Sequence, residues 1–341
     1  MIKTAVVILN WNGLEWVQKF LESVVRYSAD GKVFIADNGS TDGSVDWISM
    51  NFKDIPIIRF ESNLGFAGGY NRAFKQIDAT YFVLLNSDVG VTEGWLNPLV
   101  EYMDNNPDVA SCQPKIISYY KTDYFEYAGA AGGYIDKYGY TFCRGRIFNH
   151  IEKDTGQYDD FANIFWSTGA CMIVRSDAWI KCGGLDDDFF AHMEEIDLCW
   201  RFRLAGYRVC YVPGSTVNHV GGGSLPYDSE KKTYLNFRNN LFLLYKNLPD
   251  NKLHIVLLMR KILDGLAAIM FIFTGRYSNF KAILKAHIDY YRSIRTLKEK
   301  RKLVRDMTKN KNAGNLLNKS IVFRFYIRGE KTFNSLKIKF D

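Results

Sequence analysis

The sequence predicts an α/β protein with a mostly parallel, Rossmann-like sheet and a helical, basic C-terminal appendage. Apolar strand patterns alternate with helical patterns along the first 90 residues, which is typical of βαβ units. Each of these strands is followed by small or polar residues, so polar side chains should gather along one edge of the sheet. After Pro249 the composition becomes apolar and basic. We therefore expect one domain over residues 1–249 and a second region over residues 250–341.

The expected elements follow from the spacing of apolar residues. Short continuous apolar runs predict strands buried on both faces, and they cover residues 5–9, 33–36, 55–60, 81–85, 109–112, 171–174 and 208–212. Apolar residues at helical spacing predict helices over residues 14–25, 95–103, 194–205 and 228–247. The segment 115–165 has weak periodicity, and we expect strands and loops that cross the end of the sheet.

Composition and charge limit the class of protein. With 47% apolar and 15% aromatic residues in 341, the chain is globular rather than disordered. The six cysteines form no C-x-x-C pair, and the first residues resemble no signal peptide, so we expect free thiols in the cytoplasm. Residues 252–341 carry 21 Lys and Arg against six Asp and Glu, whereas residues 1–251 carry 23 against 31. The basic tail therefore predicts a negatively charged partner, such as a membrane surface or nucleic acid.

Asp88 follows the buried strand 81–85, at the position where open α/β sheets bind their ligands. A carboxylate in such a crevice suits Mg²⁺ or Mn²⁺ bridging phosphates. The alternative is that Asn86 and Asp88 only cap the turn that follows the strand.

Two further strand ends carry groups that suit a nucleotide. Asp37 can accept hydrogen bonds from a base or a ribose. Asn63 and the glycine-rich run 65–69 open a helix whose N-terminal amides attract diphosphate. Each signal could also be a structural turn, but their succession on neighbouring strands favours a nucleotide site.

Glu194, Glu195 and Asp197 crowd the first turn of the helix expected over residues 194–205. Acidic residues stabilise helix N-termini through the helix dipole, which is the simple explanation. Burial and like charge can also raise the pKa of one carboxyl toward neutrality, which would suit a general base.

Four motifs in this order resemble those of the family 2 glycosyltransferases, and most closely their rhamnosyltransferase-like group. They are Ile8-Leu9-Asn10-Trp11-Asn12, Asp37-Asn38-Gly39-Ser40-Thr41-Asp42, residues 63–71 and Leu85-Asn86-Ser87-Asp88. The resemblance covers roughly residues 3–247. It implies a GT-A fold, a nucleotide-diphosphate sugar donor, a divalent metal (Mg²⁺ or Mn²⁺) and inversion at the anomeric carbon. The family usually has Asp where this chain has Asn86, so Asp88 would carry most of the coordination.

The resemblance also implies roles for single residues. Those expected to bind the nucleotide sugar are Asn10, Asp37, Asn38, Asn63, Gly65, Gly68, Asn71, Asn86, Ser87, Asp88 and Arg238. Glu195 takes the place of the catalytic base, with Glu194 as the alternative. Trp166, Gly169 and Asp197 would position the acceptor, although Trp166 could be a core residue and Arg238 could tie its helix to the body. Asp88 and His219 would hold the metal, unless His219 is structural, and residues 221–223 would form a mobile lid.

Together, these expectations predict an inverting transferase that moves a sugar onto a lipid-linked or cell-surface polysaccharide acceptor. The first candidate for that sugar is rhamnose, from dTDP-rhamnose. A UDP-hexose donor is the alternative. A non-catalytic scaffold that keeps the fold is the rival from another class. Nucleic-acid binding ranks last, because no recognition motif supports it.

The appendage contains two apolar pieces, residues 253–259 and 262–273, separated by charged residues. Neither reaches the span of about 20 residues that crosses a bilayer. With the neighbouring lysines and arginines, they predict amphipathic helices at the anionic inner face of the cell membrane. The alternative is a helical domain packed on the transferase or on a second subunit in a homo-oligomer. The tail from Lys309 has no assigned role.

Overall fold

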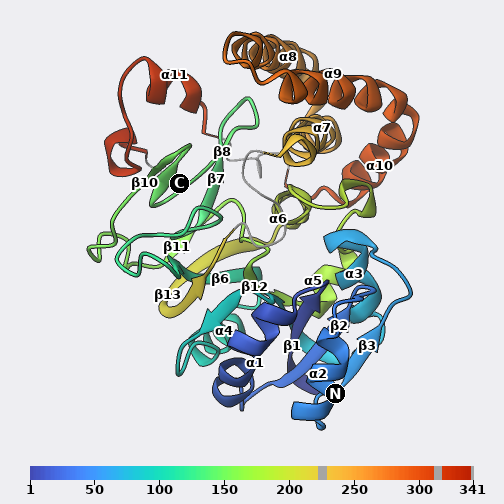
Figure 1. The fold of residues 1–341 in the computed structure, drawn as a ribbon. Coiled ribbons are helices and arrows are strands. Elements are labelled where there is room, and N and C mark those ends of the chain that lie inside the picture. The colour runs from blue at the N-terminus through green and yellow to red at the C-terminus, as the bar shows by residue number, and fades with distance from the viewer. Residues whose placement is uncertain (222–228, 311–316, 339–341) are drawn as a thin grey trace.

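The computed structural model describes residues 1–221, 229–310 and 317–338, and a nine-stranded sheet forms its centre (Figure 1). The strands run in the order β3-β2-β1-β4-β12-β6-β13-β11, and β5 pairs with β13 beside this path. Their bounds are β1 Ile2–Asn10, β2 Lys32–Asp37, β3 Ile57–Arg59, β4 Ala79–Asn86, β5 Val89–Val91, β6 Val109–Ser118, β11 Ala162–Asn163, β12 Cys171–Arg175 and β13 Arg208–His219.

The parallel part of the sheet confirms the predicted fold class. β1 lies between β2 and β4, and all three run parallel, with β3 parallel to β2 at the edge. β12 runs antiparallel to both of its neighbours, β4 and β6. The direction of β12 could not be predicted from its composition, because a short apolar run looks the same in either orientation.

Helices cover both faces of the sheet, as two separate apolar clusters show. On one face, α1 (Leu14–Tyr27), α2 (Ser44–Asn51) and α4 (Asn97–Asn105) pack against Val6 and Ile8. On the other face, α3 (Gly65–Phe74), α5 (Ser176–Lys181) and α6 (Glu194–Leu204) pack with Ala5 and Val7. Because successive residues of a strand point to opposite faces, the central residues 5–9 of β1 are all apolar.

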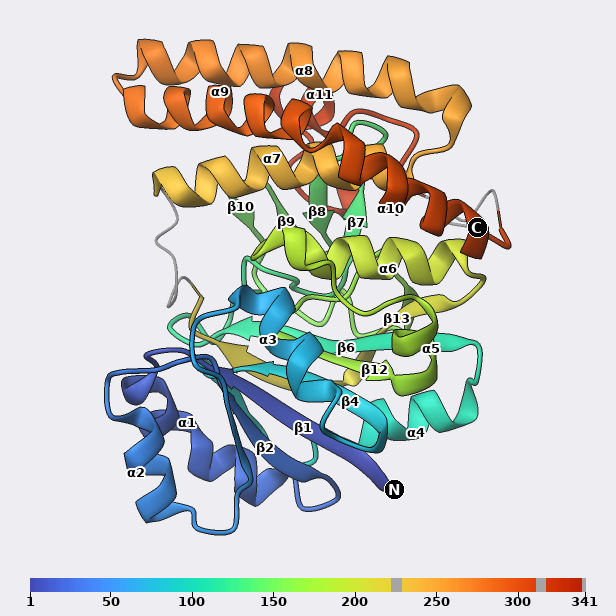
Figure 2. The same ribbon diagram turned by 90° about the vertical axis from the view of Figure 1, so that its right-hand side faces the viewer.

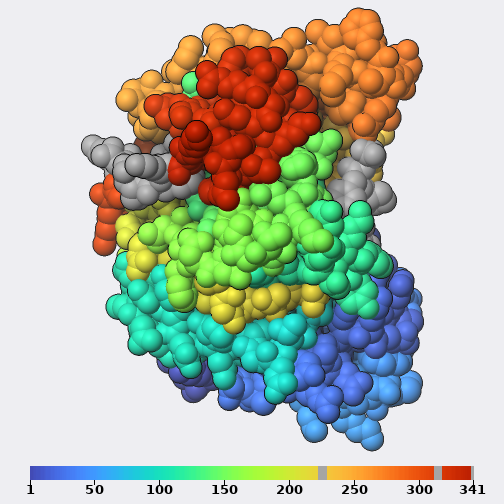
Figure 3. Space-filling view, turned by 90° about the vertical axis from the view of Figure 1, so that its left-hand side faces the viewer, coloured from blue at the N-terminus to red at the C-terminus, as the bar shows by residue number. Residues whose placement is uncertain are grey.

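The segment of weak periodicity forms a second, four-stranded antiparallel sheet. It contains β7 (Gly133–Ile135), β8 (Thr141–Cys143), β9 (Arg146–Ile147) and β10 (His150–Ile151). The C-terminal segment, with α11 (Ile321–Tyr326) and the 3-10 turn η2 (Asn334–Leu336), lies over this region (Figure 3). Phe333 donates its backbone N–H to Glu152 at 2.9 Å, so the tail has a structural role as a cover.

Four helices form the layer farthest from α1 and α2 (Figure 2). They are α7 (Glu230–Asn247), α8 (Asp250–Phe273), α9 (Tyr277–Arg292) and α10 (Ile294–Met307). α8 is one continuous helix, which corrects the expectation of two separate apolar pieces. Among the described residues, no helix combines the length and the apolar character needed to cross a membrane.

Gly133→Ala should lower the free energy of unfolding by about 1–3 kcal/mol, because a Cβ at this position would overlap the ring of Trp166. Denaturant unfolding measures the difference. Gly265→Ala is the matched control, since a Cβ there meets nothing within 4 Å and Ala stabilises a helix interior by about 1 kcal/mol. If Gly133→Ala keeps wild-type stability, Trp166 is not held in the core as described.

Candidate active site

Asn10 and Asp37 end neighbouring strands and lie opposite each other in the β1–β2 register. Asn10 Nδ2 donates to Asp37 Oδ1 at 3.1 Å and to Ser44 Oγ at 2.8 Å. The other Asp37 oxygen accepts the backbone N–H of Ser40 at 3.1 Å. The structure therefore brings both predicted nucleotide residues together and holds the Asp37 carboxylate in one orientation.

The next motif shapes the N-terminus of α3. Asn38 Nδ2 donates to Asn63 Oδ1 at 3.1 Å and to the Gly65 carbonyl at 3.0 Å. Asn63 Oδ1 also accepts the N–H of Gly65 at 2.8 Å. Gly65 adopts φ +75°, which favours glycine, and Gly68 lies in the first turn of α3 close to the Leu64 side chain. Asn38 and Asn63 thus bind each other and the helix start, and they fix where the α3 amides point.

Asp88 and His219 meet at the far side of the same sheet edge. The chain after Asp88 forms β5, which pairs antiparallel with the end of β13, so that Val89 lies opposite His219. His219 Nε2 lies 3.2 Å from Asp88 Oδ1, and its Nδ1 lies 3.2 Å from Glu126 Oε2. All three residues are at most 5% exposed. Two residues that are 131 positions apart in sequence therefore form one polar cluster.

The two carboxylates control the charge of the histidine. Burial alone would lower the pKa of His219, but Glu126 and then Asp88 outweigh it and raise that pKa to about 10. The ring is therefore a cation held between two acids in the absence of a metal ion.

The donor atoms of this cluster also suit a divalent cation. Carboxylate oxygen and imidazole nitrogen bind Mn²⁺ and Mg²⁺. Adjacent ligands of an octahedral ion at about 2.1 Å lie roughly 3 Å apart, which matches the 3.2 Å between Asp88 Oδ1 and His219 Nε2. In the described ranges, no three His, Cys, Asp or Glu side chains are arranged to hold a metal. Asp88 and His219 would therefore need diphosphate or water oxygens as further ligands.

Asn86, Ser87 and Gly169 complete the strand end. Asn86 donates its backbone N–H to the Ala170 carbonyl at 3.0 Å, which places Gly169 beside the Asn86–Asp88 turn. A Cβ at Gly169 would meet the Phe66 ring at 2.8 Å, so only glycine fits between this turn and α3. The expected contact of Gly169 with an acceptor is compatible with this position.

The chain enters α6 through a strained segment. Phe190, His192 and Met193 have φ values of +63°, +69° and +75°, a region that side chains other than Gly and Asn rarely adopt. Phe190 accepts the backbone N–H of Phe66 at 2.7 Å, so this segment packs against the start of α3. Strained backbone persists only where its surroundings hold it, and it concentrates at functional sites.

Two residues of α7 hold the strained segment. Asn239 is fully buried, and its Nδ2 lies 2.9, 2.9 and 2.8 Å from the carbonyls of Phe189, Ala191 and His192. Arg238 Nη2 donates to the Asp188 carbonyl at 2.8 Å, and its Nε donates to Asn239 Oδ1 at 2.9 Å. The structure thus favours the alternative in which Arg238 ties its helix to the body rather than contacting phosphate.

Glu194 and Glu195 begin α6 directly after the strained segment. Burial, followed by the charge of Glu195, raises the pKa of Glu194 well above its usual value. Burial raises the pKa of Glu195 to about 7, although backbone hydrogen bonds oppose the shift. Oε2 of each carboxyl is buried and has no hydrogen-bond partner among the described residues. A pKa near 7 allows a carboxyl group to take up and release a proton close to neutral pH, so Glu195 suits the role of base better than Glu194.

Asp197 has no access to a ligand, which corrects its expected role in positioning an acceptor. Its side chain is 0% exposed and pairs with Arg201 at 2.8 Å and Lys246 at 2.9 Å, while Asn247 donates to it at 2.8 Å. Burial alone would raise the pKa of Asp197, but Lys246 and Arg201 hold it below its usual value. Asp197 binds α6 to α7 inside the protein.

Trp166 also lies inside the protein, where it belongs to the apolar cluster on the α3 side of the sheet. Its Nε1 donates to the Tyr134 carbonyl at 3.0 Å, and its ring covers Gly133. The core alternative therefore describes Trp166, and the expected acceptor contact is corrected. A buried tryptophan whose N–H donates to a backbone carbonyl leaves no unsatisfied hydrogen-bond donor.

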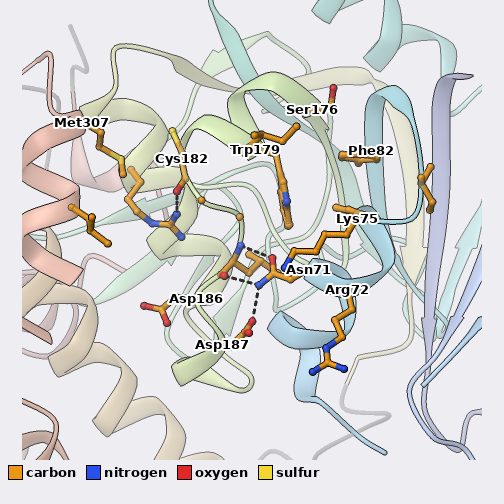
Figure 4. Close-up of a pocket in the computed structure, with 18 of the residues that line it drawn as sticks. Asn71, Arg72, Lys75, Phe82, Ser176, Trp179, Cys182, Asp186, Asp187 and Met307 are labelled. Carbon is orange, nitrogen blue, oxygen red and sulfur yellow. Dashed lines mark hydrogen bonds between the residues drawn. The ribbon is translucent and has the colours of Figure 1, made fainter. Parts of the chain in front are cut away.

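Asn71 lies in a cleft of about 1190 Å³ that is lined by α3, α5, the 182–188 turn and α10 (Figure 4). Its Nδ2 donates to the Leu185 carbonyl at 2.7 Å and to Asp187 Oδ1 at 2.6 Å. Neither Asp88 nor His219 lines this cleft. Asn71 therefore holds the turn before α6 in place, and its expected role in a nucleotide pocket stays a prediction.

The sequence did not point to Glu126 or Asn239. Glu126 lies in the segment of weak periodicity and reaches His219 because its backbone N–H binds Ile116 at the end of β6. Asn239 follows Arg238 on α7. The sequence feature that could have indicated its role is an amide side chain on an amphipathic helix. A buried amide needs hydrogen-bond partners from elsewhere in the fold. The expected lid lies outside the described residues, except for Gly221.

The mixed sheet, with its polar edge and an acidic helix start behind it, is that of a GT-A glycosyltransferase. The family model described as glycosyl transferase family 2 matches residues 5–183, so the chain belongs to that family. The family model ends before α6, so it covers the strand-end motifs but not the acidic pair.

Relatives of known activity support the same class. The chain is 26% identical over 219 residues to the N-acetylglucosaminyl-diphospho-decaprenol L-rhamnosyltransferase of Mycobacterium tuberculosis, covering 60% of this chain and 71% of that protein. It is 23% identical to the rhamnosyltransferase WbbL of Escherichia coli, covering 63% of this chain and 82% of that protein. The structure of GalNAc-T7 with UDP, GalNAc and Mn²⁺ superposes with a TM-score of 0.57 at 15% identity, covering 74% of this chain and 49% of that one. The last comparison concerns the fold alone.

Asn239→Ala should lower kcat about 100-fold while changing the KM for the donor little, because Glu195 loses its position when the strained segment relaxes. Steady-state sugar transfer at varied donor concentration measures both constants. Asn240→Ala is the matched control, since this buried neighbour donates to Gly139 at 2.6 Å and does not contact the segment. Both variants should lose about 1–3 kcal/mol of stability. Equal kcat values for the two variants would show that Asn239 has only a structural role.

Proposed function

We propose that this protein is an inverting, metal-dependent glycosyltransferase that moves rhamnose from a dTDP-linked donor onto a lipid-linked or cell-surface polysaccharide. The observation that supports this proposal most strongly is the contact between Asp88 and His219, at the same edge of the sheet as Asn10 and Asp37. The sugar is supported by the names of the two relatives, both of which are rhamnosyltransferases. A UDP-hexose donor is the alternative, since uracil and thymine present the same hydrogen-bonding edge.

The donor would lie along the strand ends. Asp37, oriented by Asn10, accepts hydrogen bonds from the base or the ribose. The amides that begin α3 face the diphosphate, and Asp88 with His219 holds the cation. When bound, a divalent cation supplies positive charge against the leaving diphosphate.

Glu195 would accept the proton of the acceptor hydroxyl. Attack from the face opposite the diphosphate inverts the anomeric carbon, and the base must therefore stand on the acceptor side of the sugar. Glu195 suits this position because it comes from α6, whose entry segment packs against the start of α3, and because one of its oxygens is unpartnered. Burial, followed by the charge of Glu195, raises the pKa of Glu194, which disfavours a second negative charge beside the base.

Residues 1–249 would form the transferase unit, and residues 250–341 an appendage that brings it to the inner face of the cell membrane. This division rests on the change of composition after Pro249 and on the excess of Lys and Arg beyond it. All six cysteines are free and buried, as suits a reducing compartment.

Asp88→Ala and Glu195→Gln should each reduce transfer at least about 1,000-fold without unfolding the protein. Calorimetry with dTDP-rhamnose and Mn²⁺ should show weaker donor binding for Asp88→Ala and unchanged binding for Glu195→Gln. The exposed Asp46 on α2 provides the control Asp46→Asn, which should behave as wild type. Wild-type transfer by either site variant would remove the role assigned to that residue.

Transfer should depend on pH with a midpoint near 7. Glu195 works only as the carboxylate, so kcat should fall about tenfold for each pH unit below its pKa of about 7 and stay level above it. Near-UV circular dichroism over the same range checks that the fold persists. A profile that is flat from pH 5 to about 8 would contradict Glu195 as the base.

A further inference from the structure

The outer face of α8 is an apolar stripe without charge. Seven residues at spacings of one to four positions, each 49–86% exposed, form it between Ile255 and Phe273. They are Ile255, Leu258, Ile262, Leu266, Ile269, Met270 and Phe273. The stripe is roughly 27 Å long at 1.5 Å per residue. Exposed apolar surface of this size in one place marks a binding surface rather than ordinary scatter.

Two charged residues in the middle of α8, Arg260 and Asp264, face inward, away from the stripe. Arg260 and Asp264 are 5% and 0% exposed and pair with each other at 2.7 Å. Asp264 also lies 3.2 Å from His287 Nε2 of α9, and Arg260 lies over the ring of Tyr140 in the β7–β8 turn. The inner face of α8 therefore docks through a buried ionic cluster, and Lys261 donates to the Tyr291 hydroxyl at 2.8 Å. The exposed Lys252 precedes the stripe, which is apolar from Ile255 to Phe273.

Cations accompany the stripe on the neighbouring helices. Lys281 and Arg292 of α9, and Arg295 and Lys298 of α10, are all exposed. Within the described residues, Lys281, Arg295 and Lys298 form no ion pair, and Arg292 has only the half-buried Asp289 at 3.4 Å. α9 adds exposed Leu284, Ile288 and Tyr291 beside these cations. The α8–α10 surface thus combines apolar and basic groups.

We propose that the outer face of α8, with the cations of α9 and α10, binds an anionic phospholipid bilayer. The stripe would enter the boundary between headgroups and acyl chains, while the cations contact lipid phosphates. A second copy of this chain fits less well, because a twofold contact through this face would bring two sets of unpaired cations together. The inference names the surface that would bring the proposed transferase to a lipid-linked acceptor, and it depends on the proposed function only for that acceptor.

Flotation of the full chain with phosphatidylcholine vesicles, with and without phosphatidylglycerol, tests the proposal. Wild type should float only with the anionic vesicles. The double variant Ile262→Ser/Leu266→Ser should bind them at least about tenfold more weakly, since two large exposed apolar groups are lost. Ile180→Ser, at an apolar residue of α5 that is 73% exposed, is the control and should bind as wild type. Flotation of the double variant at the wild-type level would overturn the proposal.

A second pair of variants tests the charges. Lys281→Gln and Arg295→Gln should each weaken binding to the anionic vesicles about fivefold, and Lys53→Gln on the opposite side should not. Analytical ultracentrifugation gives the other decisive result: a wild-type dimer that Ile262→Ser/Leu266→Ser converts to a monomer would assign the stripe to a second copy instead. Transfer to a water-soluble acceptor should be equal in wild type, in Ile262→Ser/Leu266→Ser and in the two cation variants, so failure of lipid binding is distinguishable from failure of the proposed reaction.

Discussion

The pairing of β5 with the end of β13 is the constraint on which the site depends. β5 begins one residue after Asp88, and its antiparallel register places Val89 opposite His219. β13 is held on its other side by β6, whose continuation supplies the segment that carries Glu126. Three chain segments therefore meet through backbone hydrogen bonds, and the polar cluster follows from that pairing. A carboxylate and an imidazole can be buried together only because each satisfies the other.

The N-terminus of α6 likewise depends on contacts with other parts of the chain. Two adjacent buried glutamates are unfavourable, and the segment before them is strained at three residues. The fold compensates elsewhere: Asn239 and Arg238 bind the carbonyls of that segment, and Asp197 fastens α6 to Lys246 of α7. α7 is thus the support of the proposed base although it contributes no group to the reaction.

Much of the site was predictable because strand ends are local features. Apolar runs followed by Asn10, Asp37 and Asp88 indicate polar groups at the carboxyl ends of parallel strands, and the structure places them along one edge. The reach of Glu126 and the direction of Trp166 were not predictable. Both depend on how residues 115–165 fold into a second sheet, and no periodicity in that segment indicates which strands pair.

The sequence by itself determined the class of sheet, the order of the motifs and the basic character of the C-terminal region, because these depend on residue type and spacing alone. Only the tertiary structure decided which way each side chain faces. In α8, Arg260 and Asp264 interrupt the apolar pattern along the chain, yet they lie on the face toward α9 and the β7–β8 turn. Periodicity along one chain cannot show which neighbour will satisfy a buried charge. Besides Arg260 on the same helix, Asp264 has as its partner a histidine 23 residues away, on another helix.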